Sequence, residues 1–272
     1  MKILALDSSG LVASVAVVED DGVNSSLLAE YTVNYKKTHS QTLLPMLDEI
    51  ARMIELDLNT IDAIAVAAGP GSFTGLRIGS ATAKGLGLAL DKPLVHVPTV
   101  DALAYNLYGT DRVICPLMDA RRNQVYTGIY EFRNNELSVI EPQMAVGIEV
   151  IAGKLRALGR EVVFLGDGVP VFRKALMEEL MQGMDFSFAP AHLNKQRAGA
   201  VAALAVSYVR AGKIETAAEH RPDYLRPSQA ERERAEKEAR EKAEKAKAEK
   251  AERVEKGKAE EQKEQKEAGL HE

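Results

Sequence analysis

The sequence predicts an α/β protein built from two similar halves, each with a mixed sheet of antiparallel and parallel strands. Short apolar runs alternate with segments of helical periodicity as far as about residue 227. An apolar strand that ends in Asp, followed by a polar turn and a second strand, occurs at Leu6–Ala13 and again at Met118–Val125. A strand followed by Gly-x-Gly also occurs twice, at Ala67–Gly71 and Val162–Gly168. Because both patterns recur in the same order, we expect two α/β domains with a ligand cleft at the carboxyl ends of their strands.

Apolar runs in the first half predict three consecutive strands that can form an antiparallel meander. These runs are Lys2–Ser8, Ser14–Glu19 and Leu28–Asn34. Two later strands are expected at Ala63–Ala68 and Leu94–Val97.

Apolar residues at helical spacing predict a helix over His39–Glu55. Thr38 or Ser40 is expected to cap this helix, and Pro45 is expected in its first turn, where the missing N–H costs little. Further helices are expected over Gly79–Leu90 and Thr99–Tyr108.

The patterns place an N-terminal subdomain at residues 1–108 and a C-terminal subdomain at residues 109–228. Residues 229–272 are almost entirely Ala, Glu, Lys, Arg and Gln. This composition favours a charged helical or disordered tail, because a coiled coil would need an apolar stripe that is missing here. The tail is either an extension without a specific role or a weak RNA- or protein-binding arm.

Composition excludes several classes of protein. The net charge of −5 and the absence of Trp argue against an autonomous nucleic-acid binder. The single Cys115 excludes internal disulfides and fits a reducing cytoplasm. Asp7 interrupts the first apolar run too early for a signal peptide, and no run approaches the roughly 18 residues of a membrane span. We therefore expect a cytoplasmic protein without membrane contact.

The spacing of histidines gives no metal motif. None of the five is three or four residues from another, so no helix presents paired imidazoles. Cys115 has no neighbouring cysteine, and a zinc or iron site would have to be assembled from scattered ligands. We therefore expect no metal. The histidines are His39, His96, His192, His220 and His271.

The glycine-rich segment Gly69–Gly79 is the most informative motif of the chain. An apolar run precedes it and a Gly/Ala-rich segment follows it, which predicts strand, loop and helix. Free N–H groups at the start of that helix could hold an anion. The alternative is a tight turn between strand and helix that binds nothing, since the motif matches neither the Walker pattern nor G-x-G-x-x-G.

Two helices are candidates for a partner surface. The apolar stripe of the first contains Leu43, Leu47 and Ile50, widened by Met46, and such a stripe normally packs on its own sheet. The helix after the glycine loop consists largely of Gly, Ala and Ser, which have little or no side chain. Each interior glycine lowers helix stability by roughly 1 kcal/mol relative to alanine. Either tight packing on its own sheet or the close approach of a partner helix explains this tolerance.

The glycine motif, the first strand Met1–Ser9 and the sequence His39-Ser40-Gln41 resemble the bacterial TsaB (YeaZ) family. Pro222–Arg226 resembles the usual end of that family, so the resemblance covers the chain from Met1 to about Pro227. It implies an actin/Hsp70-like duplicated fold. It also implies the role of a non-catalytic subunit that supports a paralogue, TsaD, in threonylcarbamoyl transfer to N6 of the adenosine 3′ of the anticodon in tRNAs that read A-starting codons.

The same resemblance implies which chemistry is missing. TsaD-like proteins carry a His-x-x-x-His metal motif where this chain has Thr99 and Leu103, and His96 lies outside that register. Actin-like proteins place an Asp near phosphates and Mg²⁺ at the end of the first strand of each half, where this chain has Asp7 and Asp119. Each is either a nucleotide-binding carboxylate or a structural strand-end Asp, and Asp119 has the further alternative of an ion network with its neighbouring arginines.

We expect no catalytic residue and no cofactor, with ATP or ADP bound only at an interface of the complex. The expected partners are a TsaD-type paralogue in a heterodimer and a small TsaE-type ATPase, with a homodimer when the chain is alone and tRNA contacted only through the complex. The alternative functions are a stand-alone actin-like ATPase or kinase and a metal-dependent peptidase or carbamoyltransferase. The predicted partner interface consists of His39, Leu43, Met46, Leu47, Ile50, Gly71, Ser72, Phe73, Thr74, Arg77, Gly79 and Ala83.

Overall fold

The computed structural model describes residues 1–35, 38–226, 234, 237–238 and 241–242. Residues Met1–Leu225 form one compact unit, and Arg226–Glu272 are assigned to a second. Among the described residues, no helix has the length and apolarity needed to cross a membrane.

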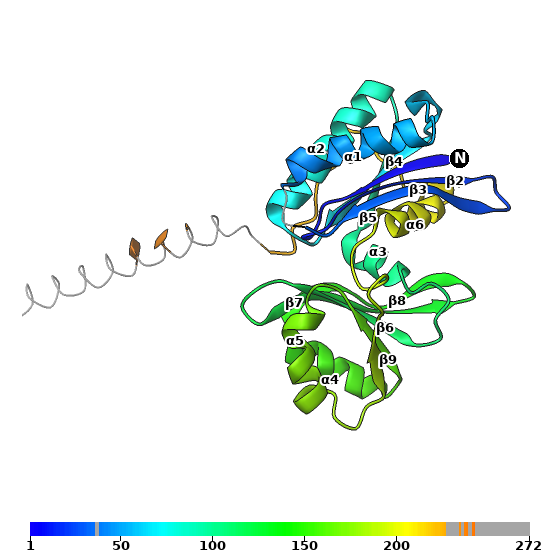
Figure 1. Ribbon diagram of the computed structural model, residues 1–272. Helices are drawn as coiled ribbons and strands as arrows, with labels where there is room; N and C mark the ends of the chain where they lie inside the picture. The colour runs from blue at the N-terminus through cyan, green and yellow to red at the C-terminus, as the bar shows by residue number, and fades with distance from the viewer. Residues whose placement is uncertain (36–37, 227–233, 235–236, 239–240, 243–272) are drawn as a thin grey trace, which may run out of the picture. The chain divides into compact units, whose positions relative to one another are not determined.

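The first sheet of the compact unit has the strand order β3-β2-β1-β4-β5 (Figure 1). β1 pairs with β2 and β2 with β3 in antiparallel register, whereas β1–β4 and β4–β5 are parallel. The antiparallel meander expected from the first three apolar runs is confirmed. The strands are β1 (Lys2–Asp7), β2 (Ala13–Asp20), β3 (Ser25–Val33), β4 (Ala63–Gly69) and β5 (Leu94–Pro98).

The second sheet repeats this topology. Its order is β10-β9-β6-β7-β8, with β6–β7 and β7–β8 antiparallel and β6–β9 and β9–β10 parallel. β6 therefore corresponds to β1 and β9 to β4, which places both repeated sequence patterns on equivalent strands. The predicted duplicated α/β fold is confirmed. The strands are β6 (Val113–Asp119), β7 (Gln124–Arg133), β8 (Glu136–Gly147), β9 (Val162–Leu165) and β10 (Phe186–Phe188).

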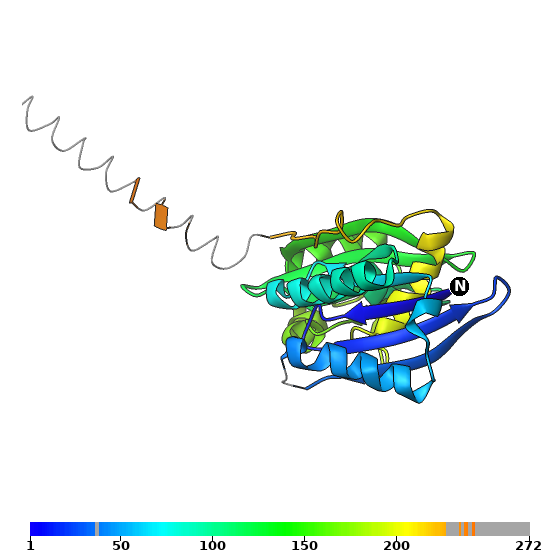
Figure 2. The same cartoon turned by 90° about the horizontal axis from the view of Figure 1, so that it is seen from above.

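Helices cover both faces of each sheet. Figure 2 shows α1 and α2 side by side on one face of the first sheet, and α6 packs on the opposite face. α3 lies between the sheets, and α4 and α5 cover the far face of the second sheet. The helices are α1 (His39–Met53), α2 (Phe73–Leu90), α3 (Thr99–Tyr105), α4 (Ile148–Leu158), α5 (Val169–Ala175) and α6 (Ala198–Arg210), with a 3-10 turn at Leu58–Thr60 and a π-helical turn at Leu176–Leu180.

Covering both faces explains why β1 is an unbroken apolar run. Ile3 and Ala5 pack towards α6, while Leu4 and Leu6 pack towards α1 and α2. Successive side chains of a strand point to opposite faces, so a sheet between two helical layers requires apolar residues at every position.

The subdomain boundaries at residues 108 and 228 stay a prediction. The second sheet is formed within residues 113–188, and the chain then returns to the first sheet, where α6 packs and Glu215 pairs with Leu94. The predicted tail at 229–272 lies almost entirely outside the described residues. The few described positions include exposed i,i+4 ion pairs, Arg234–Glu238 and Lys237–Glu241.

The expectation that Pro45 lies in the first turn of its helix is wrong. α1 begins at His39, so Pro45 lies in the second turn, at an exposed position. Thr38 occupies the N-cap position, but its side chain makes no capping hydrogen bond. The apolar stripe sets where this helix packs, and it overrides the local preference of proline.

We expect Pro45→Ala to raise the free energy of unfolding by about 1–2 kcal/mol, because alanine restores a backbone N–H donor and removes a ring clash inside α1. Urea denaturation measures this change. Leu44→Ala, at the neighbouring exposed position of α1, is the control and is expected to change the value by no more than about 0.5 kcal/mol. Equal or lower stability of Pro45→Ala would contradict the expectation.

Candidate functional site

The glycine loop lies directly against the turn that joins β1 to β2. A Cβ added at Gly71 would meet the Ser9 carbonyl oxygen at 2.3 Å, and one added at Gly75 would meet the Ser8 carbonyl oxygen at 2.0 Å. No other residue fits at such distances, so glycine is required at both positions by close backbone approach.

Hydrogen bonds fasten the loop in this place. Ser72 N–H donates to the Ser9 carbonyl at 2.7 Å, and Ser8 Oγ donates to the Gly75 carbonyl at 2.9 Å. Gly69 N–H donates to Thr99 Oγ1 at 3.1 Å, which joins the loop to the start of α3. These contacts support the tight-turn alternative for the motif, and anion binding by the loop stays a prediction.

Asp7, at the end of β1, is a buried carboxylate that holds the adjacent turn. Its side chain is 1% exposed, and Oδ1 accepts hydrogen bonds from Ser9 N–H at 2.9 Å and Ser9 Oγ at 2.7 Å. Burial raises the pKa of Asp7 to about 6, although the bonds from Ser9 and the nearby His39 oppose the shift. Asp7 thus has the structural role predicted for a strand-end Asp, and nucleotide binding by Asp7 stays a prediction.

Asp119 ends the equivalent strand β6 and takes part in an ion network. Its Oδ1 accepts from Arg121 N–H at 2.8 Å, and Oδ2 lies 3.1 Å from the Arg121 guanidinium. Its own N–H donates to Asp167 Oδ1 at 3.2 Å, and burial raises the pKa of Asp167. Asp119 as a ligand of nucleotide phosphate or Mg²⁺ stays a prediction.

Sequence reasoning missed two polar residues of this region, Asp167 and Gln196. Asp167 lies inside the repeated Gly-x-Gly pattern, so its place after β9 could have been recognised. Gln196 is 1% exposed, and its amide lies beside Gly10, where an added Cβ would be 2.9 Å from Nε2. No sequence signal pointed to Gln196.

The structure separates the predicted interface residues into two groups. Ser72, Thr74 and Arg77 are exposed, and three others are half-buried, among them His39, whose Nε2 lies 2.8 Å from the Gly10 carbonyl. The remaining six are buried in the protein's own first core: Leu43, Met46, Leu47, Ile50, Gly79 and Ala83. The stripe of α1 is therefore core, and the interface as a whole stays a prediction.

Residues 213–225, which we name the C-terminal strap, run alongside α2 back to the glycine loop (Figure 2). Asp223 N–H donates to the Ala68 carbonyl at 2.7 Å. The Tyr224 ring lies 4.7 Å from Phe73, and Arg77 lies over Phe73 at 4.1 Å. The loop is thus held by the β1–β2 turn on one side and by the strap on the other.

Thr99 and Leu103 occupy the two positions where TsaD-like proteins are expected to carry metal ligands, and both side chains are buried. Thr99 is buried with its hydroxyl bonded to Gly69, and Leu103 is buried in the core of the second sheet. The strap instead brings His96, Glu215 and His220 together, a group of possible ligands that no spacing in the sequence revealed.

Two sheets of the same topology, with Asp7 and Asp119 at equivalent strand ends and a glycine loop packed on the first turn, define a protein of the duplicated actin-like class. The family model described as TsaD, tRNA N6-adenosine threonylcarbamoyltransferase, matches residues 26–234. The TsaB tRNA threonylcarbamoyladenosine biosynthesis protein of Bacillus subtilis is 35% identical over 234 residues, which is 85% of this chain and 96% of that protein. The chain therefore belongs to the TsaD family and, within it, is a TsaB-type member.

Further relatives agree with this membership. The TsaB protein of Escherichia coli is 34% identical over 172 residues, 62% of this chain and 72% of that protein. The solved structure of YeaZ from Pseudomonas aeruginosa superimposes with a TM-score of 0.69 and 27% identity, and covers 82% of this chain and 99% of that one. The tRNA N6-adenosine threonylcarbamoyltransferase of Kosmotoga olearia is 34% identical over 108 residues, only 36% of this chain and 33% of that protein.

We expect Gly75→Ala to lower the free energy of unfolding by about 3 kcal/mol or more, because the new methyl group would force two backbone segments apart. The matched control is Gly85→Ala in the same helix, where an added Cβ meets open space. This control is expected to gain about 0.5–1 kcal/mol from helix propensity. Chemical denaturation of both variants tests the prediction, and similar changes in the two would refute the backbone contact as the cause.

We expect Asp7→Asn to stabilise the protein at about pH 8 by roughly 1–3 kcal/mol, since it removes a buried charge while keeping an oxygen acceptor for Ser9. The folded-state pKa of Asp7, about 6, lies above the ordinary value of 3.8 for an aspartate side chain. The native state therefore binds more protons between these values, and this contribution to stability falls as pH rises from about 4 to 6. The stabilisation of Asp7→Asn relative to wild type should therefore vanish near pH 3.5, where the Asp7 carboxyl is largely protonated in both the folded and the unfolded state.

Denaturation midpoints of Asp7→Asn and wild type across this pH range measure the effect. Asp48→Asn, on the exposed side of α1, is the control, and we expect it to stay within about 0.5 kcal/mol of wild type at both ends. A gain for Asp7→Asn that is equally large at pH 3.5 and pH 8 would show that charge burial is not its source.

Proposed function

We propose that this chain is a non-catalytic subunit in tRNA threonylcarbamoyladenosine biosynthesis. It supports a TsaD-type partner that transfers the threonylcarbamoyl group to N6 of the adenosine 3′ of the anticodon in tRNAs that read A-starting codons. Family membership supports the pathway, because TsaB-type relatives carry this biosynthetic role in their names.

The burial of Thr99 and Leu103 is the observation that supports a non-catalytic role for this chain. Both side chains are buried, at 0% and 1% exposed, where a TsaD-like protein is expected to hold its metal. Leucine has no ligand atom, and the Thr99 hydroxyl is engaged by Gly69. The catalytic ion then belongs to the partner.

The surface offered to that partner is the outer side of α1 and α2. The outer face of α2 consists of Thr74, Arg77, Ala81, Gly85 and Leu88, which are all exposed. Leu88 is 71% exposed, and no atom lies within 4 Å of a Cβ built on Gly85.

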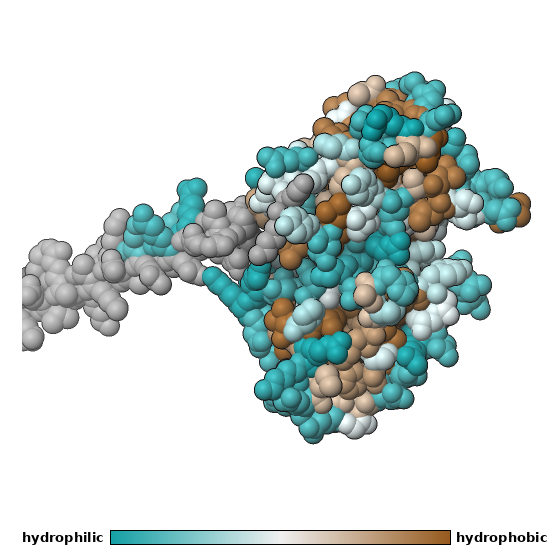
Figure 3. All heavy atoms as spheres, in the orientation of Figure 1, coloured by the Kyte–Doolittle hydropathy of each residue, from teal (hydrophilic) through white to brown (hydrophobic). Residues whose placement is uncertain are grey.

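α1 lies beside α2 and adds two exposed apolar side chains, Leu44 and Met53. Figure 3 shows hydrophobic and hydrophilic residues mixed over this part of the molecule. A smooth helix flanked by exposed apolar side chains suits close packing against helices of a second protein.

Other parts of the assembly follow from the same proposal. The chain works in the cytoplasm, a TsaE-type ATPase joins the pair, and tRNA is contacted through the complex. ATP or ADP binds at an interface rather than to this chain alone. In the absence of its partner the chain forms a homodimer through the same helices.

A second candidate function is a stand-alone actin-like ATPase. It is favoured by the carboxylates of Asp7 and Asp119 at the carboxyl ends of equivalent strands. It predicts tight binding of Mg²⁺-ATP by the purified chain, which equilibrium dialysis measures. The subunit proposal predicts no such binding without the partner.

We expect Gly85→Arg to abolish association with the TsaD-type paralogue of the same organism, because a long cationic side chain separates the helices. Gly79→Arg would be a poor test, since a Cβ there already meets Ser8 Oγ at 2.6 Å and the fold itself would be disturbed. Size-exclusion chromatography and calorimetric titration of the two proteins measure association.

The matched control is Gly153→Arg, which places the same side chain on α4, at an exposed glycine that also has open space around it. Gly153→Arg should bind the paralogue with wild-type affinity. Unchanged binding by Gly85→Arg, or equal loss in both variants, would exclude the outer face of α2 as the interface.

A further inference from the structure

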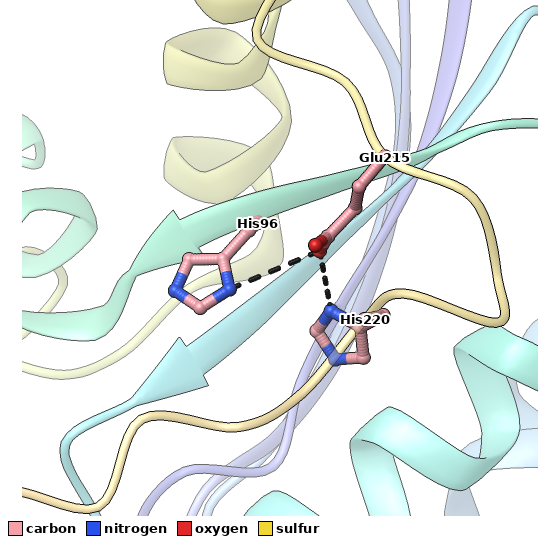
Figure 4. Close-up of side chains that lie close together, drawn as sticks. All are labelled: His96, Glu215 and His220. Atoms are coloured by element: carbon pink, nitrogen blue, oxygen red, sulfur yellow. Dashed lines mark hydrogen bonds and ion pairs between the residues drawn. The ribbon is translucent and has the colours of Figure 1, made fainter.

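Three possible metal ligands meet at the edge of the first sheet. His96 lies on the edge strand β5, and Glu215 and His220 belong to the C-terminal strap (Figure 4). Leu94 and Glu215 exchange backbone hydrogen bonds of 2.8 and 2.9 Å, which fixes the strap beside β5. The three residues are therefore brought together by tertiary structure, on two segments that are distant in the sequence.

The donor atoms converge on one carboxylate oxygen. Glu215 Oε1 lies 2.6 Å from Nδ1 of His220 and 3.9 Å from Nδ1 of His96. One ligand atom from each of the three residues lies within 4.8 Å of the others. Both imidazoles thus turn the same nitrogen towards Glu215.

The opposite nitrogens of both rings are held by other partners. Nε2 of His96 lies 3.0 Å from Asp223 Oδ2, and Nε2 of His220 lies 2.8 Å from Ser80 Oγ. Histidine ligands of metal ions almost always donate their second N–H to a carboxylate or another oxygen, which fixes the tautomer and the ring orientation. Both rings have this outer partner already in place.

We propose that His96, Glu215 and His220 bind a divalent transition-metal ion, for which Zn²⁺ suits the two imidazoles and one carboxylate. With metal–ligand bonds of about 2.0–2.2 Å, ligand atoms of a tetrahedral site lie about 3.3 Å apart. Binding therefore requires side-chain torsions that move the Glu215 carboxylate away from His220 and towards His96 and that bring the two imidazoles to the same spacing. The inference departs from the sequence-based expectation of no metal and is independent of the proposed function.

The site has an entrance from solvent. A hollow of about 340 Å³ is lined by His96 and Glu215 together with Pro98, Tyr208, Lys213 and Ile214, so an ion and a fourth ligand such as water reach the cluster from solvent.

The charges around the site are mixed. The carboxylates of Glu215 and Asp223 offset the charge of a divalent ion, while two lysine ammonium groups oppose it. Lys84 Nζ is bound by the His220 carbonyl at 3.2 Å, and Lys213 lies over the Tyr208 ring at 4.9 Å. Both ammonium groups are thus engaged by other groups, and Lys213 also lines the hollow.

A bound ion would join the strap to β5 and, through Ser80, to α2. The strap also holds the glycine loop through Asp223 and Tyr224. Because the ion binds the folded arrangement of the three ligands, it stabilises the fold by mass action. The expected ligand is thus a structural metal ion beside α2.

The test uses the full-length chain after dialysis against a chelator. We expect it to bind one Zn²⁺ per chain in a competition titration with a chromogenic chelator, and to give the intense visible absorption of tetrahedral Co²⁺ when cobalt is used as the probe. Its thermal midpoint should rise on addition of Zn²⁺. These readouts require neither enzymatic activity nor the paralogue.

His96→Ala and Glu215→Gln should each lose at least tenfold in Zn²⁺ affinity and lose the cobalt spectrum. Asp223→Ala removes only the carboxylate that contacts His96 Nε2, and its Zn²⁺ affinity should fall about 10–100-fold. His192→Ala is the matched control, because His192 is exposed and outside the cluster, and it should bind like wild type.

Three outcomes would overturn the proposal. The first is wild-type protein without stoichiometric Zn²⁺ binding, which would make the cluster a hydrogen-bonded group of Ser80, His220 and Glu215 only. The second is unchanged binding in His96→Ala and Glu215→Gln. If either ligand variant fails to fold, Asp223→Ala still decides, since wild-type affinity in that variant is the third contradictory outcome.

Discussion

The packing of the glycine loop on the β1–β2 turn is the constraint on which the rest of the first half depends. Gly71 and Gly75 bring two backbones within carbonyl contact, and this distance sets where α2 begins. α2 in turn closes the core that it shares with α1, and the strap lies along it. The glycine-rich motif thus joins the β1–β2 turn to the start of α2.

α2 has one buried side and one exposed side, and the small residues on the two sides have different surroundings. Its inner side, with Leu76, Gly79 and Ala83, is buried against the sheet, whereas its outer side carries Gly85 and Leu88 in the open. Small residues on the inner side serve close packing within the chain. Gly85 on the outer side has open space around it, and this is the surface that we propose for helix–helix contact with a partner.

Much of the fold could be predicted from the sequence, because local patterns encode it. Alternation, apolar runs and the repeated strand-end motifs gave the meander, the duplicated topology and the places of Asp7 and Asp119. The interface residues on α1 could not be separated from core, since one apolar stripe fits both roles. The cluster of His96, Glu215 and His220 was out of reach, because it forms only when the strap folds back on β5.

α3 has a consequence for how the two halves move. Its Ala102 packs in the core of the first sheet, and Val100, Leu103 and Ala104 pack in the core of the second. Hinge motions between domains are absorbed by a few residues in loops or at the ends of elements. α3 packs in both hydrophobic cores, so separation of the two halves would expose apolar side chains in each core. Opening of the two halves is therefore opposed by the loss of this apolar burial.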